Sequence, residues 1–353
     1  MCVNPGPIVL FGSGETAPGA QKIYHRVFSQ MQAPIEVSIL ETPAGFEPNS
    51  DYVAGQVGRY LEHRLQNFQP KVSVIPARKR GTGFSPDDPG LAASAAAGDA
   101  IFMGPGSPTY AARQLRDAIV WDVTRAAHRQ GAALLLASAA TLAVSRYTIP
   151  IYEIYKVGED LHWKPGLDLL GDFGLSIVFV PHWNNRDGGE ALDTSRCYLG
   201  QPRFESLLQV LPSHQGDYTV VGIDEHTALM IDLVQGQCTV LGGGHVTVIT
   251  TQGTQVHRSG SHFALNEMGA FRLPVAGEGI PAVAWEMAVE ARRGGEGARP
   301  VADEPEEAVA LLLVQREAAR NQRDWAASDR LREEIATHGW RVLDTPEGQT
   351  IVR

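Results

Sequence analysis

The chain has few cysteines, which restricts both its compartment and its chemistry. Its 353 residues include only Cys2, Cys197 and Cys238, and no Cys-x-x-Cys pair occurs. An odd number of widely spaced cysteines argues against a disulfide framework and fits a reducing compartment. The same spacing lacks the usual pattern of zinc ligands, so we expect no metal site.

Segments that direct a chain into a membrane are also missing. The first residues, MCVNPGPIVL, lack the basic region and the long apolar run of a signal peptide. The longest nearly apolar run, residues 132–144, is too short to span a bilayer. The net charge of −10 disfavours general attraction to phosphate backbones or anionic lipids. We therefore expect a cytoplasmic protein with no membrane partner.

What the sequence does contain is an alternation of short apolar runs with helical patterns, which is typical of parallel βαβ units. Strands are predicted over residues 8–11, 35–40, 72–75, 100–103, 132–137 and 175–180, with helices over 49–66 and 109–129. Four closely spaced runs, 218–223, 227–231, 238–241 and 246–249, predict an antiparallel extension of the sheet. The expected fold is α/β, a mostly parallel open sheet flanked by helices.

The composition changes after about residue 290. Residues 292–300 have the Gly, Arg and Pro content of a linker. Helical patterns over 305–320 and 324–338, then a β-ribbon around 344–348, predict a small helical hairpin at the C-terminus. We therefore predict a large domain over residues 1–275, a helix and linker over 276–304, and a tail over 305–353.

Ser138 is the first candidate for chemistry, because it follows a wholly apolar strand and has only small neighbours. A sharp strand-to-helix turn at this point would expose its hydroxyl above the sheet edge as a nucleophile. The N–H of Ala139, at the start of the next helix, could then stabilise an oxyanion. The alternative is a serine that only caps the helix. Gly106, in a glycine-rich turn after another strand, is the second candidate oxyanion donor or a plain turn residue.

His182 also follows a buried strand, where an open α/β sheet forms its ligand crevices. It could take the proton of Ser138, or it could be a structural histidine that hydrogen-bonds a loop. A carboxylate should orient the imidazole. Glu153, Glu159 and Asp160 lie between Ser138 and His182 in the chain, and sequence does not select among them.

Taken together, these residues resemble the cyanophycinase and peptidase E family of serine hydrolases. The resemblance covers about residues 5–270. It rests on residues 136–140 around Ser138, on His182 with Arg186 four positions later, on the turn 104–106 and on the long segment 222–229. It implies a class I glutamine amidotransferase-like, flavodoxin-like fold and cleavage of peptide bonds next to aspartate, with no cofactor. The implied substrate-binding residues are Arg186, Arg196, Asn184 and Asn185.

Some residues depart from the family pattern. Ala137 and Ala140 replace glycines beside the serine, and Pro105 replaces a glycine in the oxyanion turn. The segment 149–189 is also distinctive and indicates a divergent subgroup. Two hypotheses remain open: a serine hydrolase acting on a peptide or small amide, or a catalytically inactive protein that binds a ligand or tRNA. A homo-oligomer is compatible with either.

The tail contains a pattern of fixed spacing, Arg320-x-x-Arg323-Asp324-Trp325-Ala326-x-x-Asp329-x-Leu331-Arg332, followed by Gly339 and Asp344-Thr345-Pro346-x-Gly348. With this pattern, residues 305–353 resemble the C-terminal region of cysteinyl-tRNA synthetases. The His-Ile-Gly-His and Lys-Met-Ser-Lys-Ser motifs of those enzymes are absent, so we expect no tRNA charging. A candidate RNA-facing strip consists of Arg316, Arg320, Arg323, Arg330 and Arg332. Glutamates are interspersed among these arginines, and such a mixture is typical of a solvated helical face. The alternative to tRNA binding is therefore a packing or oligomerisation role for the tail.

Overall fold

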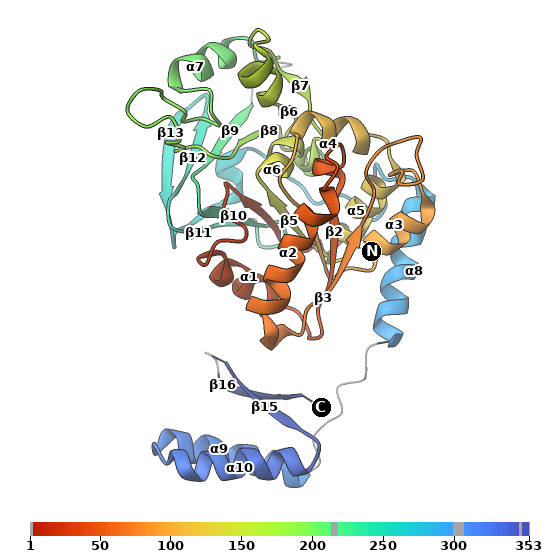
Figure 1. The fold of residues 1–353 in the computed structure, drawn as a ribbon, viewed down its shortest axis with the longest axis vertical. Coiled ribbons are helices and arrows are strands. Elements are labelled where there is room, and N and C mark those ends of the chain that lie inside the picture. The colour runs from red at the N-terminus through yellow and green to blue at the C-terminus, as the bar shows by residue number, and fades with distance from the viewer. Residues whose placement is uncertain (1–2, 213–217, 299–306, 346–347, 353) are drawn as a thin grey trace. The chain divides into compact units, whose positions relative to one another are not determined.

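The computed structural model describes residues 3–212, 218–298, 307–345 and 348–352. The chain forms two compact units, Met1–Gly295 and Glu296–Arg353 (Figure 1). The first unit is α/β, with strands and helices alternating along most of its length. Within the described residues, no helix is long and apolar enough to cross a membrane.

An eight-stranded sheet forms the centre of the first unit, in the order β14-β11-β10-β1-β5-β4-β2-β3. Five of its strands are parallel: β1 (Ile8–Phe11), β5 (Ala133–Ala137), β4 (Ala100–Met103), β2 (Glu36–Leu40) and β3 (Lys71–Ile75). Three more extend the sheet in antiparallel fashion: β10 (Thr227–Asp232), β11 (Gln237–Gly242) and β14 (His262–Ala264). The mostly parallel sheet with an antiparallel extension is thus confirmed.

The central strands are apolar throughout because both faces of the sheet are covered. Successive side chains of β1 point to opposite faces: Ile8 and Leu10 join one core cluster, whereas Val9 and Phe11 join the other. The helices are α1 (Ala20–Phe28), α2 (Ser50–Arg64), α3 (Pro89–Ala96), α4 (Pro108–Leu115), α5 (Ile119–Arg129), α6 (Ala139–Ala143), α7 (Gln201–Gln209) and α8 (Ala282–Ala298).

A second sheet, which the sequence did not predict, has the order β13-β12-β9-β8. In it, β8 (Ile177–Val180) and β9 (Thr219–Ile223) are parallel, whereas β12 (His245–Thr250) and β13 (Gly253–Arg258) are antiparallel. Two of the four runs expected to extend the main sheet, β9 and β12, therefore lie elsewhere. Apolar alternation predicts a strand, but it does not identify the strand's partner.

Two further expectations about local structure are corrected. The helix predicted over 109–129 is divided into α4 and α5, because Asp117 between them has a φ of 57° that no helix accommodates. The segment predicted as a linker, residues 292–300, is helical as far as Ala298. Its alanine, glutamate and arginine residues favour a helix enough to extend α8 through three glycines.

Short elements complete the first unit. They are the two-stranded pair β6 (Tyr147–Thr148) and β7 (Lys164–Pro165), the π-helical turn η3 (Glu153–Val157), and the 3₁₀ turns η1 (Thr42–Ala44), η2 (Gln66–Phe68), η4 (Leu169–Phe173) and η5 (Leu265–Met268). Of these, η3 matters most for the site, because its residues border two cavities.

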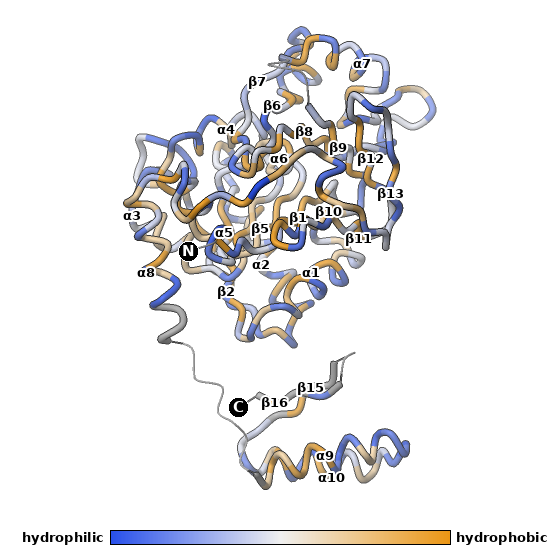
Figure 2. Tube along the Cα trace, turned by 180° about the vertical axis from the view of Figure 1, so that it is seen from behind, coloured by the Kyte–Doolittle hydropathy of each residue, from blue (hydrophilic) through white to orange (hydrophobic). Residues whose placement is uncertain are grey.

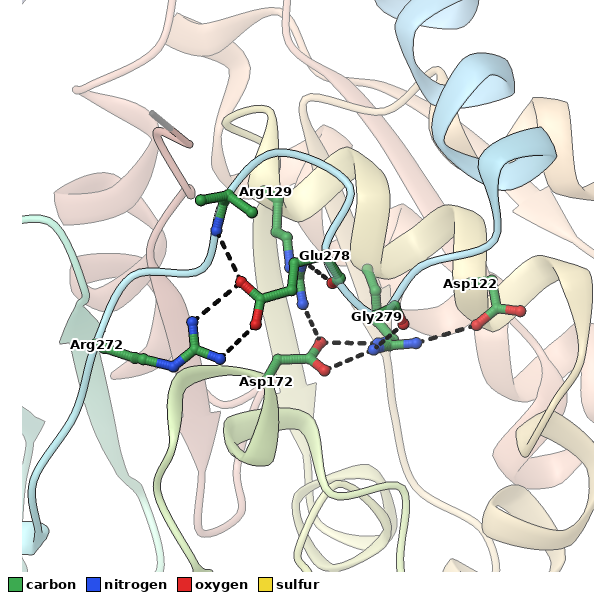
Figure 3. A network of polar contacts seen from close by, with 8 residues as sticks. Asp122, Arg129, Asp172, Arg272, Glu278 and Gly279 are labelled. Atoms are coloured by element: carbon green, nitrogen blue, oxygen red, sulfur yellow. Dashed lines mark hydrogen bonds and ion pairs between the residues drawn. The ribbon is translucent and has the colours of Figure 1, made fainter. Parts of the chain in front are cut away.

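A partly buried ionic network ties the segment before α8 to the body of the first unit (Figure 3). The side chain of Arg129, on α5, is 1% exposed, and its Nη2 lies 3.0 Å from Oδ2 of Asp172 in η4. Arg125 donates to the same carboxylate at 2.8 and 2.5 Å. Arg129 also donates to the carbonyl oxygen of Glu278, whose carboxylate pairs with Arg272. The network therefore joins α5, η4 and residues 272–279.

The second unit contains α9 (Glu307–Asn321), α10 (Trp325–Thr337) and an antiparallel pair, β15 (Arg341–Thr345) and β16 (Gly348–Val352). The expected helical hairpin with a β-ribbon is therefore present. Both hydrophobic and hydrophilic residues occur along the helices (Figure 2). Val309 of α9 and Ile335 of α10 form a small core with Trp340, which follows α10, and Val342 of β15. Asp324 caps α10, accepting from the N–H of Ala327 at 3.0 Å.

One arginine of the predicted RNA-facing strip is not on the surface. The side chain of Arg316 is buried, and its Nη1 donates to Oε1 of Gln349 at 2.7 Å. It stabilises the contact between α9 and β16, so it is unsuited to an RNA surface. Arg323, Arg330 and Arg332 are exposed, whereas Arg320 is half-buried.

Candidate active site

Ser138 occupies a sharp turn between β5 and α6. Its φ of 53° and ψ of −108° lie outside the ordinary regions for a residue with a Cβ. Thr141 stabilises the turn, because its Oγ1 lies 2.9 Å from the carbonyl oxygens of both Phe11 and Leu136. Strained conformations of this kind persist where surrounding structure enforces them, and they cluster at functional sites. The turn is the strand-to-helix elbow that the sequence predicted.

Ser138, His182 and Glu225 form a continuous chain of hydrogen bonds. Oγ of Ser138 lies 2.9 Å from Nε2 of His182, and Nδ1 of His182 lies 2.8 Å from Oε1 of Glu225. A carboxylate can only accept, so Nδ1 carries the proton and Nε2 is left to accept from the serine hydroxyl. This arrangement can transfer the serine proton to the imidazole while the carboxylate stabilises the imidazolium that forms.

Glu225 is itself oriented by Asn184 and Asn185, which follow His182 by two and three positions. Asn185, which is buried, donates from Nδ2 to Oε1 of Glu225 at 3.0 Å. Asn184 accepts from the backbone N–H of Glu225 at 2.8 Å. The hydrogen bond from His182 lowers the pKa of Glu225, burial opposes this effect, and the bond from Asn185 adds to it. The net direction is downward, which keeps Glu225 ionised near neutral pH.

The carboxylates expected beside His182 lie elsewhere. Oε1 of Glu153 accepts from Thr109 at 2.7 Å and lies 3.5 Å from Nζ of Lys164. Glu159 is exposed, with its carboxylate 3.6 Å from Nε2 of His162, and Asp160 is also exposed.

The topology of the second sheet explains the correction. β8 and β9 are parallel neighbours, with Val180 opposite Gly222. The residues that follow them, among them His182 and Glu225, therefore emerge at the same edge. Glu225 belongs to the segment 222–229, which the sequence singled out as the longest family match. The family match was therefore the signal that the sequence contained, but it did not identify Glu225 as the carboxylate that orients His182.

A cavity of about 360 Å³, the serine cavity, opens onto these groups. Its lining includes Ser138, His182, Ala139 and Gly106. Gly106 has a φ of 143°, and a Cβ at this position would lie 2.0 Å from the carbonyl oxygen of Pro43, so the turn requires glycine. Ala139 is the first residue of α6, where a backbone N–H has no acceptor within the helix.

The residues expected to bind substrate are placed differently. As far as the structure describes the chain, neither Arg186 nor Arg196 lines the serine cavity. Arg186 is exposed, whereas Arg196 stacks on Trp183 with 4.0 Å between the guanidinium carbon and the ring centroid. Asn184 and Asn185 contact Glu225, as described above. The acidic and basic side chains that do line the cavity, apart from the catalytic candidate His182, are Asp187 and Lys156.

A short left-handed stretch forms another part of the wall. Arg196, Cys197 and Tyr198 have φ values of 57°, 58° and 67°, and the Tyr198 ring lies 5.4 Å from the His182 ring. Burial raises the pKa of the Cys197 thiol to about 12, so this group stays neutral and is a poor nucleophile. Burial also raises the pKa of Tyr198, which leaves its hydroxyl protonated. Among the described residues, no cluster of His, Cys, Asp or Glu side chains is arranged to hold a metal ion.

Comparison with a solved structure shows what fold the first unit has. A peptidase from an acI-B1 Actinobacterium superimposes with a TM-score of 0.58 and 20% sequence identity, covering 74% of this chain and 97% of that one. At this identity the likeness is one of fold. The comparison agrees with the α/β class expected from the family resemblance.

Comparisons of sequence concern the C-terminal part of the chain. Residues 302–351 match the family described as the cysteinyl-tRNA ligase anticodon binding domain. Cysteine–tRNA ligase 1 of Burkholderia lata is 53% identical over 53 residues, which are 15% of this chain and 11% of that one. The cysteine–tRNA ligase of Rubrobacter xylanophilus is 35% identical over 91 residues, 26% of this chain and 17% of that one.

The matched segments are thus a small part of both ligases. The chain joins a unit with the fold of a bacterial peptidase to a tail that is similar in sequence to the anticodon binding domain of cysteinyl-tRNA ligases.

Proposed function

We propose that the first unit is a serine hydrolase that cleaves a peptide or amide bond. The observation that carries this proposal is the chain of hydrogen bonds from Ser138 through His182 to Glu225, at 2.9 and 2.8 Å. Oγ of Ser138 attacks the carbonyl carbon while Nε2 of His182 takes its proton. The imidazolium then gives this proton to the leaving amine, and water releases the acyl group in a second step.

The backbone around the serine supports this role. Ala139 and Gly106 line the same cavity as the nucleophile, and we assign their N–H groups to the oxyanion that forms on the attacked carbonyl. Glu225 holds the imidazole in the tautomer that leaves Nε2 free to accept. No step of this mechanism needs a group that the chain does not supply, apart from water.

The experiment that tests the proposal is labelling of the folded protein with a fluorophosphonate, which reacts with activated serines. We expect the parent protein to be labelled and Ser138→Ala to be unlabelled, with Ser206→Ala as the control. Ser206 is an exposed serine on α7, outside the serine cavity. Equal labelling of Ser138→Ala, or no labelling of folded parent protein, would overturn the proposal.

A second function is favoured by the tail, which we propose binds tRNA. The match over residues 302–351 supports it, as do the exposed Arg323 and Arg330 and the half-exposed Trp325, over whose ring Arg320 lies at 5.8 Å. Exposed cations beside an aromatic face can contact the backbone and bases of an unpaired loop.

Binding of unfractionated tRNA to the full chain, titrated with salt, tests this function. The double variant Arg323→Ala, Arg330→Ala should weaken binding and flatten its salt dependence. Arg203→Ala, which removes an exposed arginine from α7 in the first unit, should leave both unchanged. Equal binding by all three proteins would exclude the tail arginines as the contact.

A further inference from the structure

A second and larger cavity adjoins the serine cavity. Its volume is about 870 Å³, and Tyr152 and Lys156 line both spaces. The turn at the start of α4 also borders both, because Gly106 and Pro108 line the serine cavity while Ser107 and Thr109 line the larger one. Ligand pockets for small molecules range from about 300 to 1,000 Å³, so the larger space alone accommodates several amino-acid residues.

This larger space, here called the cationic cavity, is rich in positive charge although the whole chain is acidic. Lys164 is paired with Glu153 at 3.5 Å, and Arg80 is paired with Asp87 at 3.3 Å. The carboxylates in its lining are Glu47, Asp117 and Glu153, and its cations are Arg80, Arg113, Arg116, Lys156 and Lys164. The lining therefore has an excess of cations even with these pairs counted.

Arg113 and Lys156 have no carboxylate partner within the part of the chain that the structure describes. Each lies against an aromatic ring instead: Arg113 is 5.2 Å from the centroid of Tyr110, and Lys156 is 5.3 Å from that of Tyr152. Rings of this kind stabilise a cation and fix its position without neutralising its charge. An anionic ligand group would complete the coordination of both side chains.

We propose that the cationic cavity binds a carboxylate of the peptide that Ser138 cleaves, at a distance of more than one residue from the scissile bond. The proposal rests on the hydrolase function proposed above. Lys156 borders both cavities, so it lies where the bound peptide passes from one to the other. The hydrolase therefore acts on acidic oligopeptides, and a dipeptide leaves the cationic cavity empty.

Binding to the full-length Ser138→Ala variant tests the inference without turnover. The probes are hexa-L-glutamate and hexa-L-glutamine, both with amidated C-termini, measured by titration calorimetry at low salt. We expect only hexaglutamate to bind, and we expect Arg113→Gln to weaken its binding about tenfold, which is the scale of one charge-assisted contact. Arg203→Gln, at an exposed position of α7, is the matched control and should bind as the parent does.

Hexaglutamine with a free C-terminus separates two sources of the carboxylate. If it binds as well as amidated hexaglutamate and depends equally on Arg113, the cavity takes the chain terminus, and the proposed carboxylate site stands. Equal binding of the two amidated peptides, or unchanged affinity in Arg113→Gln, would overturn the proposal.

Fluorophosphonate labelling of the parent protein separates this inference from the hydrolase function. The probe is small and needs only the serine cavity, so its reaction reports on Ser138 and not on the cationic cavity. Normal labelling combined with hexaglutamate binding that ignores Arg113 would remove the cationic site and retain the hydrolase. Arg113-dependent binding without any labelling of the parent would retain the site as a peptide-binding cavity and remove the hydrolase.

Discussion

Glu225 accepts a hydrogen bond from His182 at 2.8 Å although the two residues are 43 positions apart. The contact exists because β8 and β9 are parallel neighbours, so the loops that follow them meet at one edge of the second sheet. The contact with His182 also distinguishes Glu225 from the other carboxylates that the sequence offered. Glu225 lies behind the imidazole, whereas Glu153 and Glu159 pair with a lysine and another histidine.

The first prediction concerns this contact. Glu225→Gln should lower the rate of fluorophosphonate labelling of Ser138 about a hundredfold or more, because an amide favours the wrong imidazole tautomer and cannot stabilise the imidazolium. Glu159→Gln is the matched control and should label at the parent rate. A loss in the control equal to that in Glu225→Gln would show that the carboxylate assignment is wrong.

The second prediction concerns Asn185, a positioning residue that acts through Glu225. Asn185→Ala removes a hydrogen bond that lowers the pKa of Glu225, so this pKa should rise. Glu225 is then protonated at a higher pH, and the acid limb of the labelling rate against pH should move upward. A uniformly lower rate with an unmoved acid limb would indicate only a structural role for Asn185.

The third prediction concerns stability in acid. Burial lowers the pKa of His128 to about 4, and its Nδ1 lies 3.1 Å from the carbonyl oxygen of Ala132. Below pH 6.5 the unfolded chain binds a proton that the folded chain does not, so the free energy of unfolding falls as the pH falls toward 4. The loss attributable to His128 is about 3 kcal/mol.

His128→Asn retains a donor to Ala132 but does not titrate in this range. Urea unfolding at pH 7 and pH 4.5 should therefore show a smaller loss of stability in this variant than in the parent. Identical losses in the two proteins would rule out His128 as a source of acid sensitivity.

The fourth prediction concerns the network of Figure 3. Asp172→Asn leaves the buried guanidinium of Arg129 without its carboxylate and should lower the free energy of unfolding by about 3 kcal/mol. Arg272→Ala removes a solvent-exposed pair with Glu278, which water screens, and should lower the free energy of unfolding by much less. Urea unfolding of both variants measures the two losses of stability. Equal losses would contradict the prediction that the buried pair contributes more to the free energy of unfolding than the exposed pair.

The sequence predicted the elements best where the chain is buried on both faces. The continuous apolar runs 8–11 and 100–103 coincide with β1 and β4, because a central parallel strand has no polar face to interrupt the pattern. The division of one predicted helix at Asp117 was not predicted. A left-handed residue there depends on the packing of its surroundings, which no local pattern records.

The sequence by itself determined which residues follow the strands, and in this way it identified Ser138 and His182 as candidates. It also determined the character of the tail, whose match to cysteinyl-tRNA ligases is local and continuous. Only the tertiary structure decided which strand exits meet, because strand pairing joins segments far apart in the chain. The pairing of β8 with β9 brought Glu225 to His182, and Asn184 and Asn185 hydrogen-bond to Glu225 there. The tertiary structure also placed Lys156 of η3 in the lining of both cavities.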